Sequence, residues 1–169
     1  SIACSGPIKS TMPDDATMER LRETKTDSLT TVLENIDITQ FTKDEKMNYA
    51  WWLARLHFMQ RRSLINDTLI HQALEYYKEQ NSPRIVYAYL LAGEQINSLG
   101  NKFKEARELY EKALEASNFY NDTYHNEYIA RHLLESYRAP EDHKRYRELL
   151  EIIKNNKPLS LNAYYSLIY

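Results

Sequence analysis

The sequence predicts an all-α fold, an array of antiparallel helical hairpins. The chain of 169 residues contains only three Gly and five Pro, whereas sheet proteins need such turn residues every few positions. Apolar residues recur at the spacing of amphipathic helices, in segments of about three to four turns. Short connections join these segments, and short connections make consecutive helices antiparallel neighbours.

Composition and charge limit the classes of function. Hydrophobic residues make up 43% and charged residues 27%, which is the balance of a soluble globular domain. The formal net charge is −2, so there is no basic excess for phosphates and we expect no nucleic-acid partner for this segment. No run approaches the ~18 apolar residues of a membrane-spanning helix. The 14 Tyr residues suit helices that are partly core and partly interface.

The N-terminal residues SIACSGPIKSTM lack helical periodicity and predict a flexible tether over residues 1–12, ahead of a helical domain over residues 13–169. Because the chain does not begin with Met, we expect residues to have been removed upstream. The single cysteine, Cys4, follows Ala3 as in the cleavage site of bacterial lipoproteins, although Ser1 stands where that site has an apolar residue. The resemblance implies a lipid anchor on Cys4, and the alternative is a free thiol in a tail.

Two short helices are expected next. Pro13 with Asp14 and Asp15 predicts a helix start, because Pro suits the first turn and carboxylates suit the positive end of the helix dipole. The first amphipathic helix covers residues 16–26. The second covers residues 26–37 and has an inward face of Leu29, Val32, Leu33 and Ile36.

The third helix has the clearest start. TKDE, at residues 42–45, fits a capping box. The segment MNYAWWLARLHFMQRR is then apolar nearly all round, which predicts burial between neighbours on two sides. Asp67 is expected to cap a helix over residues 68–80, which NSP at residues 81–83 ends.

The remaining helices follow in the same manner. Residues 84–99 and 102–117 predict a hairpin closed at Gly100, because Gly accepts the left-handed conformation. Asp122 is expected to cap the next helix, and Pro140 with its following acidic residues opens another. The apolar segment LSLNAYYSLIY predicts one more helix without a partner, so we expect the C-terminus to cut through a longer array.

Residues 89–113 resemble a tetratricopeptide repeat. That repeat has an aromatic residue, a small pair and an apolar residue on its first helix, a Gly at the turn, and small and aromatic residues on its second helix. The matching positions here are Tyr89, Ala92, Gly93, Ile96, Gly100, Phe103, Ala106, Tyr110 and Ala113. Gly93 and Ala106 are expected where the two helices cross, with Ala54 and Ala130 as their equivalents in looser repeats. The turn is one residue longer than in the family, and no Pro follows the second helix. The resemblance implies that the hairpins stack into a right-handed superhelix.

Residues 18–117 also resemble the tetratricopeptide lipoproteins and membrane-tethered regulators of Bacteroidetes bacteria. The resemblance implies repeats that face the periplasm at the cell envelope, and the alternative location is the cytoplasm. Some members of that family continue through a membrane helix to a cytoplasmic segment. The chain is therefore expected to be a sensor or scaffold part of a longer protein.

In a repeat of this kind the first helices line a concave groove, and their exposed positions meet the partner. Aromatic, Arg and acidic residues together suit a protein or peptide ligand. Two alternatives remain open: the aromatic residues are core, or the charges form a solvated face. The candidate groove residues are Asn48, Trp51, Arg55, Phe58, Tyr87, Leu90, Glu94, Asn97, Tyr124, Glu127, Arg131 and Glu135.

No motif predicts catalysis or a bound metal. The sequence contains no Gly-rich phosphate loop, GxSxG, HExxH or paired CxxC. His132 and Glu135 lie one turn apart, but no other potential ligand stands at a suitable spacing. His57 is expected to be a hydrogen-bonded core residue. We therefore expect no catalytic residue, metal or cofactor, and a non-catalytic protein- or peptide-binding scaffold. The alternatives are a self-association module that pairs through the C-terminal helix, and an enzyme, which converging pKa-shifted groups in the groove would favour.

Overall fold

The computed structural model describes residues 11–137 and 139–156. Across these residues the chain is all-helical and contains no strand, so the predicted all-α class is confirmed. Cys4 and the predicted C-terminal helix at residues 159–169 lie outside the described residues. The α-helices are α1 (Asp15–Thr24), α2 (Thr26–Asn35), α3 (Lys43–Met59), α4 (Ile70–Glu79), α5 (Ile85–Asn97), α6 (Phe103–Phe119), α7 (Thr123–Leu134) and α8 (His143–Asn155), with a 3-10 helix η1 (Pro140–Asp142) before α8.

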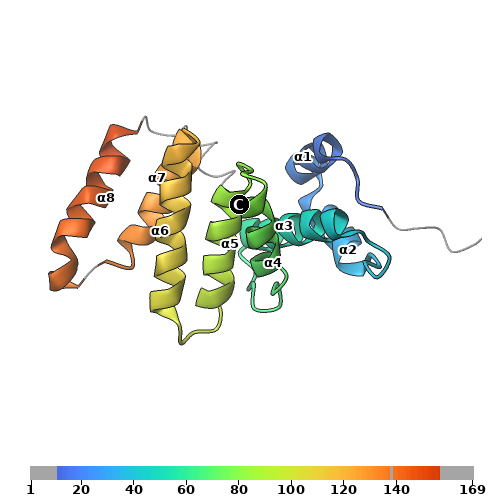
Figure 1. Ribbon diagram of the computed structural model, residues 1–169, viewed down its shortest axis with the longest axis horizontal. Coiled ribbons are helices and arrows are strands. Elements are labelled where there is room, and N and C mark those ends of the chain that lie inside the picture. The colour runs from blue at the N-terminus through green and yellow to red at the C-terminus, as the bar shows by residue number, and fades with distance from the viewer. Residues whose placement is uncertain (1–10, 138, 157–169) are drawn as a thin grey trace, which may run out of the picture.

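The helices follow one another in space in the order of the chain. Each α-helix packs against the helix before it and the helix after it, and α3 also packs against α5. Figure 1 shows the resulting row, with α1 at one end and α8 at the other. Within the described residues no helix is long and apolar enough to cross a membrane.

Two clusters of buried side chains form the core. The first runs from α1 to α5 around Trp52, which is 1% exposed, and the second runs from α5 to α8 around Ile129 and Leu133. Four partly buried side chains pack against both clusters and tie the two halves of the row together: Phe58, Ile85, Tyr87 and Tyr89.

The crossing of α5 and α6 is as close as predicted. A Cβ atom at Gly93 would lie 2.5 Å from Cε1 of Tyr110 and 3.3 Å from the backbone oxygen of Ala106. Ala106 is buried, as are Ala54 and Ala130. Gly100 has a φ of 77°, so the expected left-handed turn closes the hairpin.

Two of the expected helix caps are confirmed. The Thr42 hydroxyl accepts from the amide of Glu45 at 3.2 Å, and the Glu45 carboxylate accepts from the amide of Thr42 at 2.8 Å, which is a complete capping box. Asp122 accepts from the amide of His125 at 3.1 Å.

Two local predictions are wrong. Asp67 does not cap α4, which begins at Ile70 without a side-chain cap, because its carboxylate instead contacts the His57 ring at 2.8 Å. Val32 does not face the core: it is 57% exposed, whereas Leu29 and Leu33 of the same helix are buried. α2 packs against α1 and α3 near the end of the row, so its buried face is narrower than the sequence predicts.

Candidate partner-binding face

The candidate groove residues lie on α3, α5 and α7 or at the end of α7, as predicted. Their exposure differs from the expectation: Trp51, Arg55, Leu90 and Glu127 are all under 9% exposed. Burial at these positions supports the alternative that part of the set is core. The candidate face therefore has to be built from what each side chain contacts.

Arg55 of α3 lies among three aromatic rings. Its guanidinium carbon is 5.1 Å from the ring centroid of Trp51, 4.9 Å from that of Trp52 and 4.8 Å from that of Tyr87. A guanidinium at these distances is attracted by the electron-rich ring faces, and more strongly where water is excluded. Burial raises the pKa of the Tyr87 hydroxyl, and the Arg55 charge partly offsets this increase.

Arg84, just before α5, completes this group, which we call the arginine–aromatic cluster: Trp51, Trp52, Arg55, Arg84 and Tyr87. The Arg84 guanidinium lies 4.5 Å from the Trp51 ring centroid, and the Trp51 indole N–H donates to the Arg84 backbone oxygen at 3.2 Å. Its Nη1 also donates to Oδ1 of Asn48 at 2.6 Å. The predicted residue Asn48 thus orients an arginine that the sequence analysis did not single out.

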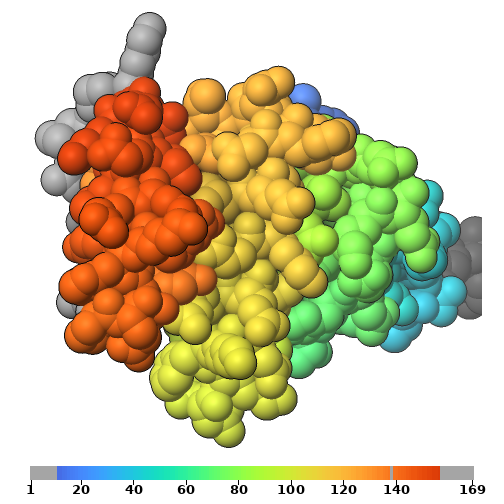
Figure 2. All heavy atoms as spheres, turned by 60° about the vertical axis from the view of Figure 1, so that its left-hand side comes forward, coloured from blue at the N-terminus to red at the C-terminus, as the bar shows by residue number. Residues whose placement is uncertain are grey.

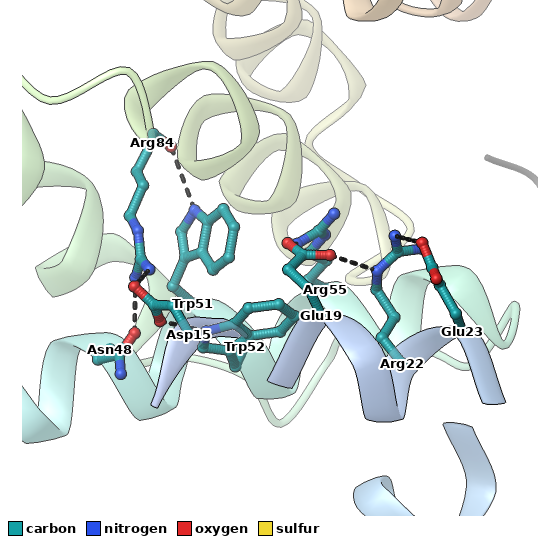
Figure 3. Close-up of polar contacts among 9 residues, drawn as sticks. All are labelled: Asp15, Glu19, Arg22, Glu23, Asn48, Trp51, Trp52, Arg55 and Arg84. Atoms are coloured by element: carbon teal, nitrogen blue, oxygen red, sulfur yellow. Dashed lines mark hydrogen bonds and ion pairs between the residues drawn. The ribbon is translucent and has the colours of Figure 1, made fainter. Parts of the chain in front are cut away.

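Two carboxylates of α1 contact the arginine–aromatic cluster. Arg84 Nη2 lies 2.6 Å from Oδ2 of Asp15, and Arg55 Nη1 lies 2.8 Å from Oε1 of Glu19. The indole N–H of Trp52 donates to Oδ1 of Asp15 at 3.3 Å. Figure 3 shows both carboxylates directed from α1 toward the arginines.

The charge of Glu19 is stabilised by its arginine neighbours. Burial alone would raise the pKa of this carboxyl, but hydrogen bonds and charge from Arg55 and Arg22 hold it below its ordinary value. Asp15 and Glu19 were missed as site residues because nothing local in the sequence places α1 beside α3. The one available signal was their spacing of four residues, which puts both on one helix face.

The other half of the candidate face contains an open pocket between α5, α6 and the end of α7. Its volume is about 510 Å³. The predicted residues Asn97 and Glu135 line it, and Phe103, at 63% exposure, adds an apolar wall. Figure 2 shows the start of α6, in yellow, projecting at the lower end of the molecule. The complete lining is Asn97, Phe103, Lys104, Arg107, Tyr110, His132, Glu135 and Ser136.

Glu94 does not line this pocket but contacts two residues that do, Tyr110 and His132. The Tyr110 hydroxyl donates to the Glu94 carboxylate, and Nε2 of His132 lies 2.6 Å from its Oε1. Burial alone would raise the pKa of Glu94, but these two partners hold it below its ordinary value. Burial and the Glu94 charge raise the pKa of Tyr110. Tyr110 therefore remains a protonated donor, and the group fixes α5, α6 and α7 to one another.

The α7 residues form the outer part of the face. Arg131 Nη2 lies 2.6 Å from Oε1 of the buried Glu127, and Arg131 itself is exposed. The ring of Tyr124 packs edge-on against His125, with centroids 5.0 Å apart. Phe58 meets Tyr128 of α7 edge-on at 5.9 Å. Phe58 is thus a packing residue between α3 and α7 as well as a candidate contact.

Three of the histidines, His57, His125 and His132, contact carboxylates. His57 contacts Asp67 at 2.8 Å and Glu34 at 2.9 Å, as expected of a hydrogen-bonded core histidine. Among the residues that the structure describes, no group of three or more His, Cys, Asp or Glu side chains is arranged to hold a metal ion.

Comparison with known proteins adds no relative: no protein-family model, curated protein or solved structure matches this chain significantly. The candidate face is therefore defined by its geometry. It has two parts, the arginine–aromatic cluster on α3 and the start of α5, and the pocket between α5, α6 and α7.

Proposed function

We propose that this chain is a non-catalytic protein- or peptide-binding domain, a scaffold or sensor built as a tetratricopeptide-like right-handed superhelix. The observation that carries the proposal is the pocket between α5, α6 and α7, where Asn97 and Glu135 meet the exposed Phe103. The superhelix is supported by helices that pack chiefly on their neighbours in sequence and by the close crossing at Gly93.

The lining of the pocket favours a peptide with an apolar and an acidic group. Phe103 exposes 63% of its surface, and exposed aromatic residues are common anchors of protein interfaces. Lys104 and Arg107 add positive charge on the same side of α6. Arg107 is oriented by the Ser136 backbone oxygen at 3.2 Å and by the Tyr137 ring at 4.5 Å. Its Nη1 also lies 3.7 Å from Oδ2 of Asp142, so a ligand carboxylate would compete with Asp142 for this guanidinium.

We place this function at the cell envelope, facing the periplasm, with a lipid anchor on Cys4. The support is the lipoprotein-like sequence around Cys4. Radiolabelled palmitate is expected to label the intact precursor and to be lost from a Cys4→Ala variant. Equal labelling of the two proteins would contradict the anchor and leave the cytoplasmic alternative.

The binding function is tested by comparing three immobilised proteins: wild type, a Phe103→Ala/Arg107→Glu variant and a Phe119→Ala control. Phe119 is 77% exposed near the other end of the same helix and lines no part of this pocket. Wild type and control are expected to retain the same envelope proteins, and the pocket variant is expected to lose them. Identical profiles for all three, with equal circular dichroism spectra, would overturn the pocket as the binding site.

The alternative of a self-association module is tested on the same wild-type protein by sedimentation. A mass that stays at one chain across a hundredfold range of concentration is expected from a scaffold for other proteins. A mass that rises with concentration and is insensitive to the Phe103→Ala/Arg107→Glu change would favour self-association.

A further inference from the structure

We propose that the arginine–aromatic cluster is a binding site for an amphipathic helix that presents two carboxylates four residues apart, and that α1 occupies this site in the free chain. The inference rests on the proposed binding function, because it names the class of partner for the part of the candidate face that does not include the pocket. α1 is then an exchangeable cover, which a partner helix of the same pattern displaces.

The contacts of α1 define what the site recognises. Asp15 and Glu19 are four residues apart and contact Arg84 and Arg55, arginines 69 and 36 residues further along the chain. Met18, on the same side of the helix, is fully buried. The site therefore selects an apolar residue between two carboxylates on one helix face, and a basic helix would meet two like charges.

α1 does not use all the hydrogen-bond donors of the arginine–aromatic cluster. Arg55 gives Glu19 one bond, from Nη1, while its buried Nε has no hydrogen-bond partner among the described residues. Glu19 is also shared with Arg22, whose Nε donates to it at 2.8 Å. Because Nε and Nη2 of a guanidinium can hold a carboxylate through two parallel bonds, a partner carboxylate at that edge of Arg55 would bind better than Glu19 does at Nη1.

α1 is held less firmly than α3, the helix against which it lies. α1 has ten residues, and Met18 is its one buried side chain. The side chains of Asp15 and Glu19 stay 60% and 45% exposed, so water and salt screen both ion pairs. α3, by contrast, has a complete capping box and buries both of its Trp residues. A short helix with one buried residue opens before the core does, so the cluster can be uncovered without global unfolding.

The test uses the whole chain and a fluorescent synthetic peptide with the sequence of residues 13–25. An Asp15→Asn/Glu19→Gln variant weakens the resident helix and leaves the arginines intact. This variant is expected to bind the peptide about tenfold more tightly than wild type does. Adding Arg84→Gln to it should remove that gain, and a peptide with Asn and Gln at the two acidic positions should bind neither protein. Glu23→Gln, a 68% exposed site on α1 that contacts no residue of the cluster, is the matched control.

Each outcome decides the inference. A gain of about tenfold that falls with added salt and is absent from the Glu23→Gln control supports it. Equal or absent peptide binding by the variant and wild type, with unchanged circular dichroism, would mean that α1 is a permanent packing element and would overturn it. That result leaves the pocket untouched, because capture of envelope proteins through Phe103 and Arg107 is measured separately. If peptide binding and the capture of envelope proteins both fail, the proposed function is overturned as well.

Discussion

Replacing Gly93 with Ala is expected to disrupt the packing of α5 on α6. The added methyl group would lie 2.5 Å from Cε1 and 2.7 Å from Cδ1 of Tyr110, inside any normal carbon contact. The Tyr110 ring cannot simply turn away. It is 3% exposed, its hydroxyl donates to Glu94, and its edge meets the His132 ring with centroids 4.5 Å apart.

Opposing terms set the size of the effect of Gly93→Ala. Ala favours a helix over Gly by about 1 kcal/mol. An extra methyl group in a well-packed contact costs about 1–3 kcal/mol, and a hydrogen bond to a charged group is worth about 1.5–3 kcal/mol. Because moving the Tyr110 ring sacrifices its bond to Glu94, the steric and polar terms act together. The net loss in the free energy of unfolding is about 2–4 kcal/mol, or a fall in Tm of roughly 5–15 °C for a chain of this size.

Urea and thermal denaturation followed by circular dichroism measure this loss. Gly100→Ala is the matched control: Gly100 has a φ of 77° but no atom within 4 Å of an added Cβ. Its cost should therefore be the left-handed strain alone, about 1–2 kcal/mol. Adding Tyr110→Leu should make Gly93→Ala less costly than it is alone, by about 1 kcal/mol or more. A Gly93→Ala protein as stable as wild type would refute the reasoning.

Three further changes have defined outcomes. Burial opposes protonation of His57, but the contacts with Asp67 and Glu34 outweigh burial and raise the pKa of the ring above its ordinary value of 6.5. The charged ring therefore stabilises the fold fully below pH 6.5, and this stabilisation is lost as the pH rises through the raised pKa. His57→Gln should therefore lower the Tm more at about pH 5.5 than at about pH 9 in parallel scans, and equal losses would contradict this. Thr42→Ala should cost about 1 kcal/mol in urea denaturation through loss of the capping box, and an unchanged midpoint would show that the cap contributes nothing. Phe58→Ala should cost about 2 kcal/mol by the same method, because a half-buried ring that joins both clusters leaves a partial cavity.

Local signals explain why much of the fold was predictable. Thr42, Asp122 and Gly100 act on backbone groups within a few residues of themselves, so their roles can be inferred from sequence alone. The small size of Gly93 is also informative, because a glycine inside a helical pattern needs a packing reason.

Contacts between segments far apart in the sequence explain the two wrong predictions, for Asp67 and Val32. Asp67 could have capped α4, but His57, ten residues earlier, offers a partner that the fold brings within 2.8 Å. Val32 has the right period for a core face, yet α2 lies near the end of the row and packs chiefly against α1 and α3. Sequence periodicity predicts which side of a helix is buried, whereas the width of the buried face depends on how many helices pack against it.

The candidate face illustrates the same limit. Arg55 and Arg131 occupy equivalent predicted positions, but Arg55 is 8% exposed among three rings and bound to Glu19, whereas Arg131 is exposed and paired with Glu127 on its own helix. The difference comes from the three rings around Arg55 and from α1, whose Glu19 pairs with it. The predicted positions alone therefore do not distinguish a buried arginine from an exposed one, because contacts with α1 decide that and they are not visible in the local sequence.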